Sequence, residues 1–184
     1  MFSHFTENSY EKALIELFQE MGYEYAYGPD IERNYQEPYY LAQVWASLPI
    51  VNPSKHQNAI AEAVKKLTNI DSGDISQKNS VFMDYLQNGI TVAYHDGKEV
   101  RHDIVYLIDY EKPHRNTFQI INQWTYVEKS EKRADLIVFV NGLPLVLIEL
   151  KSPSREETDA SAAYRQIRNY MFEIPSMFTY NAFC

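Results

Sequence analysis

The sequence predicts one α/β domain built on a mixed central sheet flanked by helices. Apolar residues recur at helical spacing through about residue 89. A hairpin pattern and nearly unbroken apolar runs follow from residue 90, and no repeat, low-complexity tract or long linker divides the chain. With 184 residues, 45% of them hydrophobic, the chain can bury a single core. We therefore expect one domain over residues 1–184.

The N-terminal part, about residues 1–89, is expected to be helical. The first helix should run from about Glu7 to Met21 and stop at Gly22, since glycine is common where a helix ends. Five apolar residues at helical spacing predict its buried face: Tyr10, Leu14, Leu17, Phe18 and Met21. A second helical pattern covers about residues 38–47.

Two further helices carry sequence signals at their starts. Ser54 with Gln57, and Asp74 with Gln77, match the capping box, in which each side chain satisfies a backbone N–H of the other residue. The helix after Asp74 should end at Gly89. The expected buried residues of the two helices are Ile60, Ala63, Val64 and Leu67, and then Val81, Phe82, Tyr85 and Leu86.

The second part, about residues 90–184, should hold the sheet. The expected strands are residues 90–95, 100–108, 117–128, 134–140 and 145–150. Asp96-Gly97 indicates a hairpin between the first two. The last two are the apolar runs on either side of Asn141-Gly142, which are typical of central strands covered on both faces. A final helix is expected at about 161–172, and residues 178–184 look like the beginning of another strand.

Composition narrows the class of protein. The single cysteine, Cys184, excludes an internal disulfide framework and a cysteine-rich zinc site. No run of about 18 apolar residues is present, so we expect no membrane segment. The first residues lack the basic and then apolar layout of a signal peptide, which predicts a cytoplasmic protein.

The net charge of −8 counts against strong DNA binding, because phosphate affinity comes mainly from Lys and Arg. The charge is uneven, however. Residues 1–128 hold 10 basic and 18 acidic side chains, whereas residues 129–184 hold 7 of each. Any DNA-binding face is therefore expected in the last third of the chain.

Three ionisable residues interrupt the apolar strand pair RADLIVFVNGLPLVLIELKSPS, residues 133–154: Asp135, Glu149 and Lys151. Burial of an isolated charge is costly, so such groups need a partner, a metal or a shifted pKa. Glu149 and Lys151 are two residues apart and point to one face of a strand. Asp135 should lie across from them if the strands form a hairpin.

This combination suits hydrolysis of a phosphodiester. Two converging carboxylates make a hard oxygen site that suits Mg²⁺. A neighbouring lysine can place or deprotonate a water, and the metal can stabilise charge on the phosphate. An ordinary salt bridge at strand ends is the alternative, because these residue types are common there. The apolar residues that bracket the three charges favour the functional interpretation.

Asp135 followed by Glu149-Leu150-Lys151 resembles the motif of the PD-(D/E)xK nuclease superfamily. The wider sequence resembles the N-terminal nuclease domain of type I restriction enzyme R subunits. The matching segments are residues 10–28, 107–128, 133–154 and 163–183. The resemblance is weakest between about 29 and 89, and it is most specific in 133–154. It implies a restriction-endonuclease-like fold.

The resemblance also implies a set of site residues. Asp135 and Glu149 would be the metal ligands, with the main-chain carbonyl of Leu150 as a third oxygen, and Lys151 would be the catalytic lysine. The family's Q-x-x-x-Y motif is matched by Gln166 and Tyr170, one helical turn apart and near the DNA backbone. Core packing is the alternative for Tyr170.

The implied activity is Mg²⁺-dependent cleavage of double-stranded DNA, in a complex with methylation and specificity subunits. A catalytically silent module of the same fold, used for DNA binding or subunit docking, is the alternative. Glu7 and Glu11 lie where many nucleases of the superfamily place another acid, but we favour a solvated helix face for them.

Two departures from the family pattern are visible. Ala134 replaces the proline of the motif's name, which contributes no chemistry. The family's ATP-using motor domains are absent, since no G-x-x-x-x-G-K-[ST] occurs in the chain. Because the sequence stops inside an expected strand, we expect the natural polypeptide to continue.

A shared site requires that Asp135 and Glu149 lie on one face of the sheet. A three-residue loop at 141–143 would pair 140 with 144 and so 135 with 149. A two-residue loop would pair 135 with 148 and, without a bulge, would place the two carboxylates on opposite faces. The turn therefore decides whether the site exists.

Overall fold

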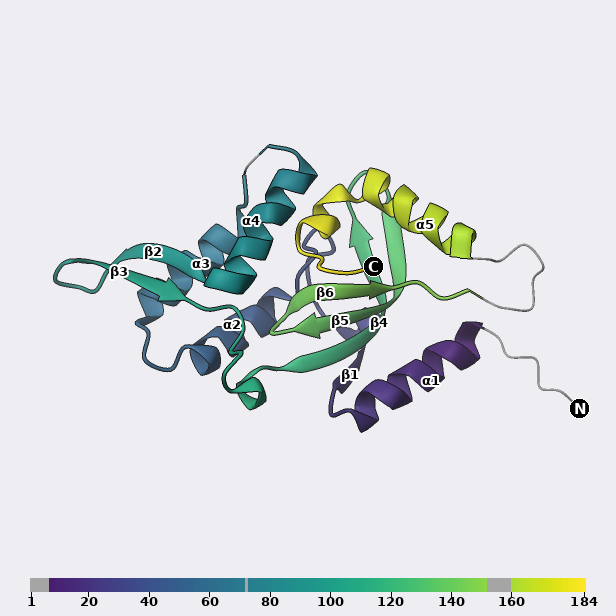
Figure 1. Ribbon diagram of the computed structural model, residues 1–184, viewed down its shortest axis with the longest axis horizontal. Helices are drawn as coiled ribbons and strands as arrows, with labels where there is room; N and C mark the ends of the chain where they lie inside the picture. The colour runs from purple at the N-terminus through teal and green to yellow at the C-terminus, as the bar shows by residue number, and fades with distance from the viewer. Residues whose placement is uncertain (1–6, 72, 152–159) are drawn as a thin grey trace, which may run out of the picture.

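The computed structural model describes residues 7–71, 73–151 and 160–184, and side chains there except those of Glu7 and Ala160 (Figure 1). The helices of this part of the chain are α1 (Glu7–Glu20), α2 (Leu41–Val51), α3 (Gln57–Thr68), α4 (Ile75–Asn88) and α5 (Ala160–Glu173). Its strands are β1 (Glu24–Tyr27), β2 (Ile90–His95), β3 (Val100–Val105), β4 (Phe118–Val127), β5 (Glu131–Val140) and β6 (Leu143–Ile148). Three short 3-10 helices are η1 (Gly28–Asp30), η2 (Pro113–Arg115) and η3 (Pro175–Thr179).

The central sheet has the strand order β1-β4-β5-β6. β1 runs parallel to β4, and the other neighbours are antiparallel. This confirms the α/β fold with a mixed central sheet. The hairpin β2–β3 forms a second, two-stranded sheet. β1 lies in the part expected to be helical and was not predicted.

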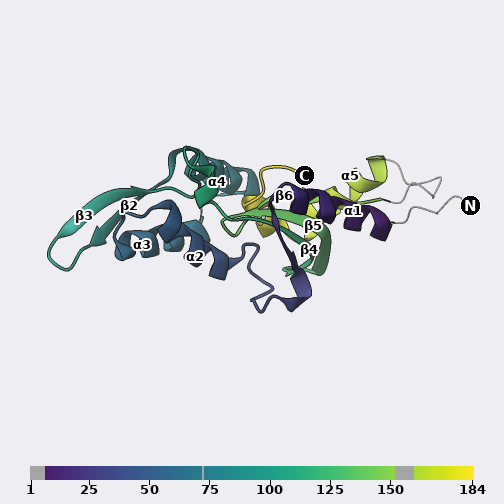
Figure 2. The ribbon, with the colours of Figure 1, turned by 90° about the horizontal axis from the view of Figure 1, so that it is seen from below.

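Helices cover both faces of the central sheet (Figures 1 and 2). On one face, Ile15 of α1 packs against Ile120, Leu136 and Val138. On the other face, α5 and η3 cover a cluster that includes Trp124, Phe139 and Tyr170. A third cluster joins α2, α3 and α4 to the β2–β3 ribbon, which projects away from the central sheet.

The buried face of α1 was predicted correctly only in part. Ile15 is buried, and Leu14 and Phe18 pack beside it, but Leu17 and Met21 are exposed. The reason is that α1 turns its Glu11 side toward polar residues of β4, which rotates the other apolar residues outward.

The start of α3 also differs from the prediction, whereas α4 agrees with it. Residues 53 and 54 form a turn, and α3 begins only at Gln57, where the His56 side chain accepts a hydrogen bond from Asn58 N at 3.1 Å. Ser54 therefore caps nothing. Asp74 and Gln77 form the expected capping box, and α4 ends at Gly89 in a positive-φ conformation.

Tertiary contacts explain why two segments, α2 and residues 178–184, differ from their predicted bounds. α2 begins three residues later than expected and continues through Pro49 to Val51, where Leu48 and Val51 enter the core. The expected strand at 178–184 is mostly absent. Asn79 donates its side-chain amide to three carbonyls at 178, 179 and 181, which curls this segment, and only Phe183 forms a parallel bridge to β6.

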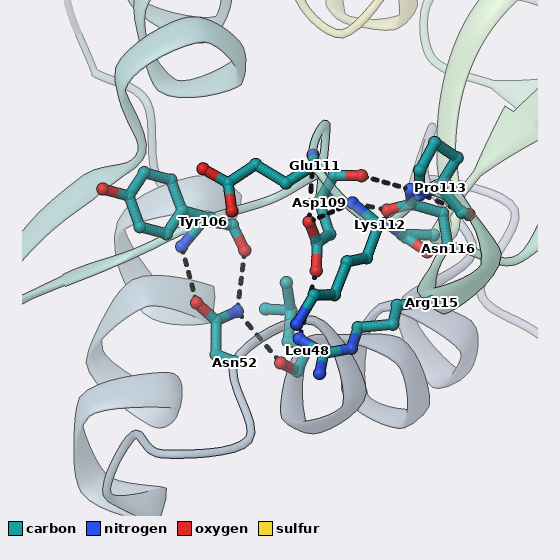
Figure 3. A network of polar contacts seen from close by, with 10 residues as sticks. Leu48, Asn52, Tyr106, Asp109, Glu111, Lys112, Pro113, Arg115 and Asn116 are labelled. Carbon is teal, nitrogen blue, oxygen red and sulfur yellow. Dashed lines mark hydrogen bonds and ion pairs between the residues drawn. The ribbon is translucent and has the colours of Figure 1, made fainter.

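The connection from β3 to β4 is fixed by side-chain hydrogen bonds (Figure 3). The Asn52 amide donates to the carbonyls of Leu48 and Tyr106 and accepts from Tyr106 N. Asp109 accepts from the backbone N–H groups at 111 and 112 and from the Arg115 guanidinium at 3.3 Å. These bonds tie the segment after β3 to the end of α2 and fix the shape of the loop that leads to β4.

None of the helices in the described ranges is both long and apolar enough to span a bilayer.

Candidate active site

The turn between β5 and β6 sets the register of the site. Asn141 and Gly142 both have positive φ, and Val140 pairs with Leu143, so the loop has two residues and not three. A bulge then restores the register, because Phe139 pairs with Pro144 whereas Val138 pairs with Val146. The ladder reaches Leu136 opposite Ile148, and one further step brings 135 beside 149.

Asn141 holds this turn in place. Its side-chain oxygen accepts from Thr117 N at 2.8 Å, and its amide donates to Leu107 O and Asn116 Oδ1, both at 2.9 Å. Gly142 packs so closely on α2 that an added Cβ would lie 2.6 Å from Tyr40 O. The turn is thus anchored to both neighbouring segments.

Asp135 and Glu149 meet where β5 and β6 diverge. Asp135 Oδ2 accepts a hydrogen bond from the backbone N–H of Leu150 at 2.8 Å. The Glu149 side chain is only 3% exposed, and its Oε2 is buried with no partner among the described residues. A buried carboxylate oxygen without a partner is costly, so this atom is the clearest sign of a missing ligand.

Lys151 lies against the same carboxylate. Its ammonium is 3.0 Å from Glu149 Oε1 and also donates to the carbonyl of Leu150 at 3.0 Å. The side chain keeps 21% of its surface exposed. The ammonium therefore sits at the boundary between the carboxylates and solvent.

The pKa of Glu149 is raised to about 7, mainly by burial; the charge of Asp135 acts in the same direction, and Lys151 opposes both effects. Two neighbouring carboxylates with one lysine are short of positive charge. A divalent cation would remove this shortage and favour the ionised form of both acids.

Helix α5 adds the two motif residues on its inward face. The Gln166 amide donates to Glu149 Oε1 and, at 2.9 Å, to the Tyr170 hydroxyl. Tyr170 is buried in the core beneath the site, and its hydroxyl contacts Arg133 O at 3.4 Å. Both residues lie in one hydrogen-bond network with Glu149. Tyr170 also packs in the core, which was the alternative interpretation of this residue.

β4 contributes polar residues that the sequence analysis missed. Gln123 has a φ of 55° and lies unpaired opposite Asp135, between the pairs Asn122–Leu136 and Trp124–Ala134. Glu11 accepts hydrogen bonds from Asn122 at 2.6 Å and from Gln123 at 2.9 Å. The solvated-face interpretation of Glu11 is therefore wrong, and the Glu7 side chain lies outside the described residues.

A sequence signal for this feature exists in retrospect. Asn122 and Gln123 are adjacent polar residues inside a β-rich run. In a regular strand their side chains would point to opposite faces, yet both donate to Glu11. Gly28 also marks the close approach of β1's end, since an added Cβ would lie 2.6 Å from Asn122 O and 2.9 Å from Gln123 O.

The donor set fits one hard cation. No cluster of three or more His, Cys, Asp or Glu side chains is found in the described part of the chain, so the acids of this site are the pair Asp135 and Glu149. The candidate oxygen donors are Glu149 Oε2, which has no partner among the described residues, an Asp135 oxygen and the Leu150 carbonyl. All-oxygen donors of this kind suit Mg²⁺ or Mn²⁺ better than zinc.

Two converging carboxylates and a lysine at the end of a mixed sheet agree with the resemblance to PD-(D/E)xK nucleases. The family model for the type I restriction enzyme R protein N terminus matches residues 4–184. The chain therefore belongs to that family.

Similar proteins carry the same description. The chain is 34% identical to the type I restriction enzyme HindI endonuclease subunit of Haemophilus influenzae, over 95% of this chain and 18% of that protein. It is 31% identical to a putative type I restriction enzyme MjaIXP endonuclease subunit of Methanocaldococcus jannaschii, over 92% of this chain and 17% of that protein. The chain thus spans less than a fifth of the length of these two relatives.

Proposed function

We propose that this domain is a Mg²⁺-dependent endonuclease that hydrolyses DNA phosphodiester bonds within a type I restriction complex. The observation that carries the proposal is Glu149 Oε2, a buried carboxylate oxygen that has no partner among the described residues and lies beside a second carboxylate. The ion pair with Lys151 supplies a partner to Oε1 of Glu149 only. The remaining oxygens point to a cation rather than to a structural salt bridge.

Each side chain then has a role. Asp135, Glu149 and the Leu150 carbonyl would hold the ion, which supplies Lewis-acid stabilisation of the charge on the phosphate when bound. Lys151 adds a compact positive charge beside the reacting phosphate and orients the attacking water. Gln166 keeps the Glu149 carboxylate in its rotamer, as outer residues do for metal ligands.

The similarity to type I restriction enzyme endonuclease subunits supports the setting of this activity. We infer that double-stranded DNA is the substrate and that methylation and specificity subunits are partners, as in type I restriction enzymes. ATP would be consumed by the motor domains of the restriction complex. A weak intrinsic affinity for DNA agrees with the net charge of −8, because the complex would deliver the DNA.

Calorimetric titration with Mn²⁺ tests the metal site directly. The wild-type domain should bind the ion, and Asp135→Ala should abolish the heat of binding because one ligand is lost. Asp84→Ala, a change at an exposed carboxylate of α4, is the matched control and should bind as wild type does. Equal binding by Asp135→Ala and wild type would refute the proposed ligand set.

A silent DNA-binding or docking module remains the second candidate, favoured by the acidic charge of residues 1–128. In that case the site would bind no metal at micromolar to millimolar concentrations. Cleavage assays with Lys151 variants, described below, separate the two functions.

A further inference from the structure

The outward face of α5 carries exposed arginines and aromatic rings, in contrast to the acidic net charge of the protein. Tyr164, Arg165, Arg168 and Phe172, here called the α5 stripe, are all exposed. At 100° per residue they fall within one sector, opposite the face that carries Gln166 and Tyr170. The α5 stripe is therefore a surface separate from the candidate active site.

The arginines of the α5 stripe have no acidic partner among the residues that the structure describes. From Ala160 to Phe172 the sequence has two arginines and no Asp or Glu. Neither arginine forms an ion pair with any residue in the described ranges. Glu173, the acid at the helix end, is already paired with Lys132 at 2.6 Å.

A third cation extends the stripe at its C-terminal end. The Lys129 ammonium donates to the Phe172 carbonyl at 2.9 Å and lies 4.8 Å from the centre of the Phe172 ring. The nearby acid Glu128 is occupied by hydrogen bonds from Ser176 N and Oγ, both at 3.0 Å. Three cations thus line one side of a protein whose net charge is −8.

Two aromatic rings flank the arginines. Tyr164 is 62% exposed and Phe172 is 73% exposed, so both rings present large faces to solvent. Eight residues of α-helix separate them by about 12 Å along the axis, with Arg165 and Arg168 between. Exposed rings stack on nucleobases whose faces are free, whereas guanidinium groups pair with phosphates.

We propose that the α5 stripe binds a single-stranded segment of nucleic acid, with Arg165 and Arg168 on successive phosphates and Tyr164 and Phe172 stacked on unpaired bases. The inference rests on the proposed function, which brings DNA to this domain, but it concerns a second contact outside the cleavage site. The aromatic rings favour an unpaired strand, because bases in a duplex are already stacked on their neighbours.

Fluorescence anisotropy in EDTA and low salt tests this contact. The probes are a fluorescein-labelled oligothymidylate, an abasic oligomer of equal length and a duplex of equal length. The wild-type domain should prefer oligothymidylate to both other probes. Arg165→Ala with Arg168→Ala should weaken its binding about tenfold and reduce the slope of log K against log salt by about 1.4, at about 0.7 per phosphate contact.

Matched variants separate stacking from charge. Tyr164→Ala with Phe172→Ala should weaken oligothymidylate binding about tenfold and leave the abasic oligomer unaffected. Lys98→Ala with Lys112→Ala removes two exposed cations elsewhere and should change binding little. Circular dichroism of every variant should match wild type, because all of these side chains are exposed.

Three results would overturn the proposal. They are an equal loss of oligothymidylate affinity in the double arginine and the double lysine variants, a preference of the wild-type domain for duplex, or unchanged oligothymidylate binding in the double arginine variant. The last result would assign the stripe to a protein partner instead. All probes are measured in EDTA, so no metal contributes to the binding in this assay. A failure of the nuclease proposal would thus appear in the Mn²⁺ titration and not in this assay.

Discussion

Gln166 donates its side-chain amide to the Glu149 carboxylate and thereby links α5 to the end of β6. The same amide contacts the Tyr170 hydroxyl at 2.9 Å, so two residues one helical turn apart act on one carboxylate. The Q-x-x-x-Y spacing is explained by this geometry. Gln166 and Lys151 both donate to Oε1 of Glu149, which leaves Oε2 without a partner among the described residues.

Gln166→Ala should weaken Mn²⁺ binding and cleavage about 10–100-fold, because the Glu149 rotamer loses its support. Asn169→Ala, an exposed change on the same helix, is the control and should leave both unaltered. Calorimetry on the domain and cleavage by the reassembled complex provide the two measurements. Wild-type metal affinity in Gln166→Ala would show that the hydrogen bond has no positioning role.

Lys151→Ala in a reassembled complex should abolish cleavage, with a loss of at least about 10²–10³ in rate, and leave ATP hydrolysis and translocation running. Lys151→Arg should also be impaired, since a planar guanidinium does not replace a compact ammonium at a fixed position. Cleavage and ATPase should be measured side by side. A silent binding module would instead show a nearly normal arginine variant, and joint loss of both activities would indicate a structural role for Lys151.

The metal-free domain should lose stability as the pH rises. Burial raises the pKa of Glu149 from 4.5 to about 7, so the folded protein holds this proton more tightly than the unfolded chain. The associated stability is present below about pH 4.5 and is lost as the pH rises to about 7. Between these values the free energy of unfolding in EDTA should fall by on the order of 2 kcal/mol more in wild type than in Glu149→Gln.

Urea unfolding at several pH values measures this difference. Mg²⁺ should stabilise wild type most above about pH 7, where the carboxylate would otherwise be ionised without a counter-charge. Parallel pH curves for wild type and Glu149→Gln would contradict the raised pKa of this group.

Gly28→Ala should destabilise the domain by about 2–3 kcal/mol, because its Cβ would collide with the carbonyl oxygens of Asn122 and Gln123. Gly22→Ala provides a comparison, since its position has positive φ but no atom within 4 Å of the added Cβ. Strain alone should cost about 1 kcal/mol there. If Gly28→Ala unfolded at the same urea concentration as wild type, the chain at Gly28 would not be packed tightly against the backbone of Asn122 and Gln123.

The sequence by itself determined the class of fold and the residues of the candidate site. Apolar runs around Asn141-Gly142 predicted adjacent central strands, and Asp135, Glu149 and Lys151 stood out because charges are costly in such runs. The capping box at Asp74 was visible because it depends on residues three apart. These features depend on residues that are close in the sequence, so they can be recognised from the sequence alone.

Only the tertiary structure decided whether those residues meet. The two-residue turn at 141–142 would have separated Asp135 from Glu149, and a bulge in β6 restored the register. Asn141, Asn79 and Glu11 act through partners 24 or more residues away in the chain, so no local pattern reveals the turn, the curled segment at 178–181 or the positive φ of Gln123. Long-range hydrogen bonds outweigh local preferences at these positions, because a buried polar group left without a partner costs more than a changed strand or helix boundary.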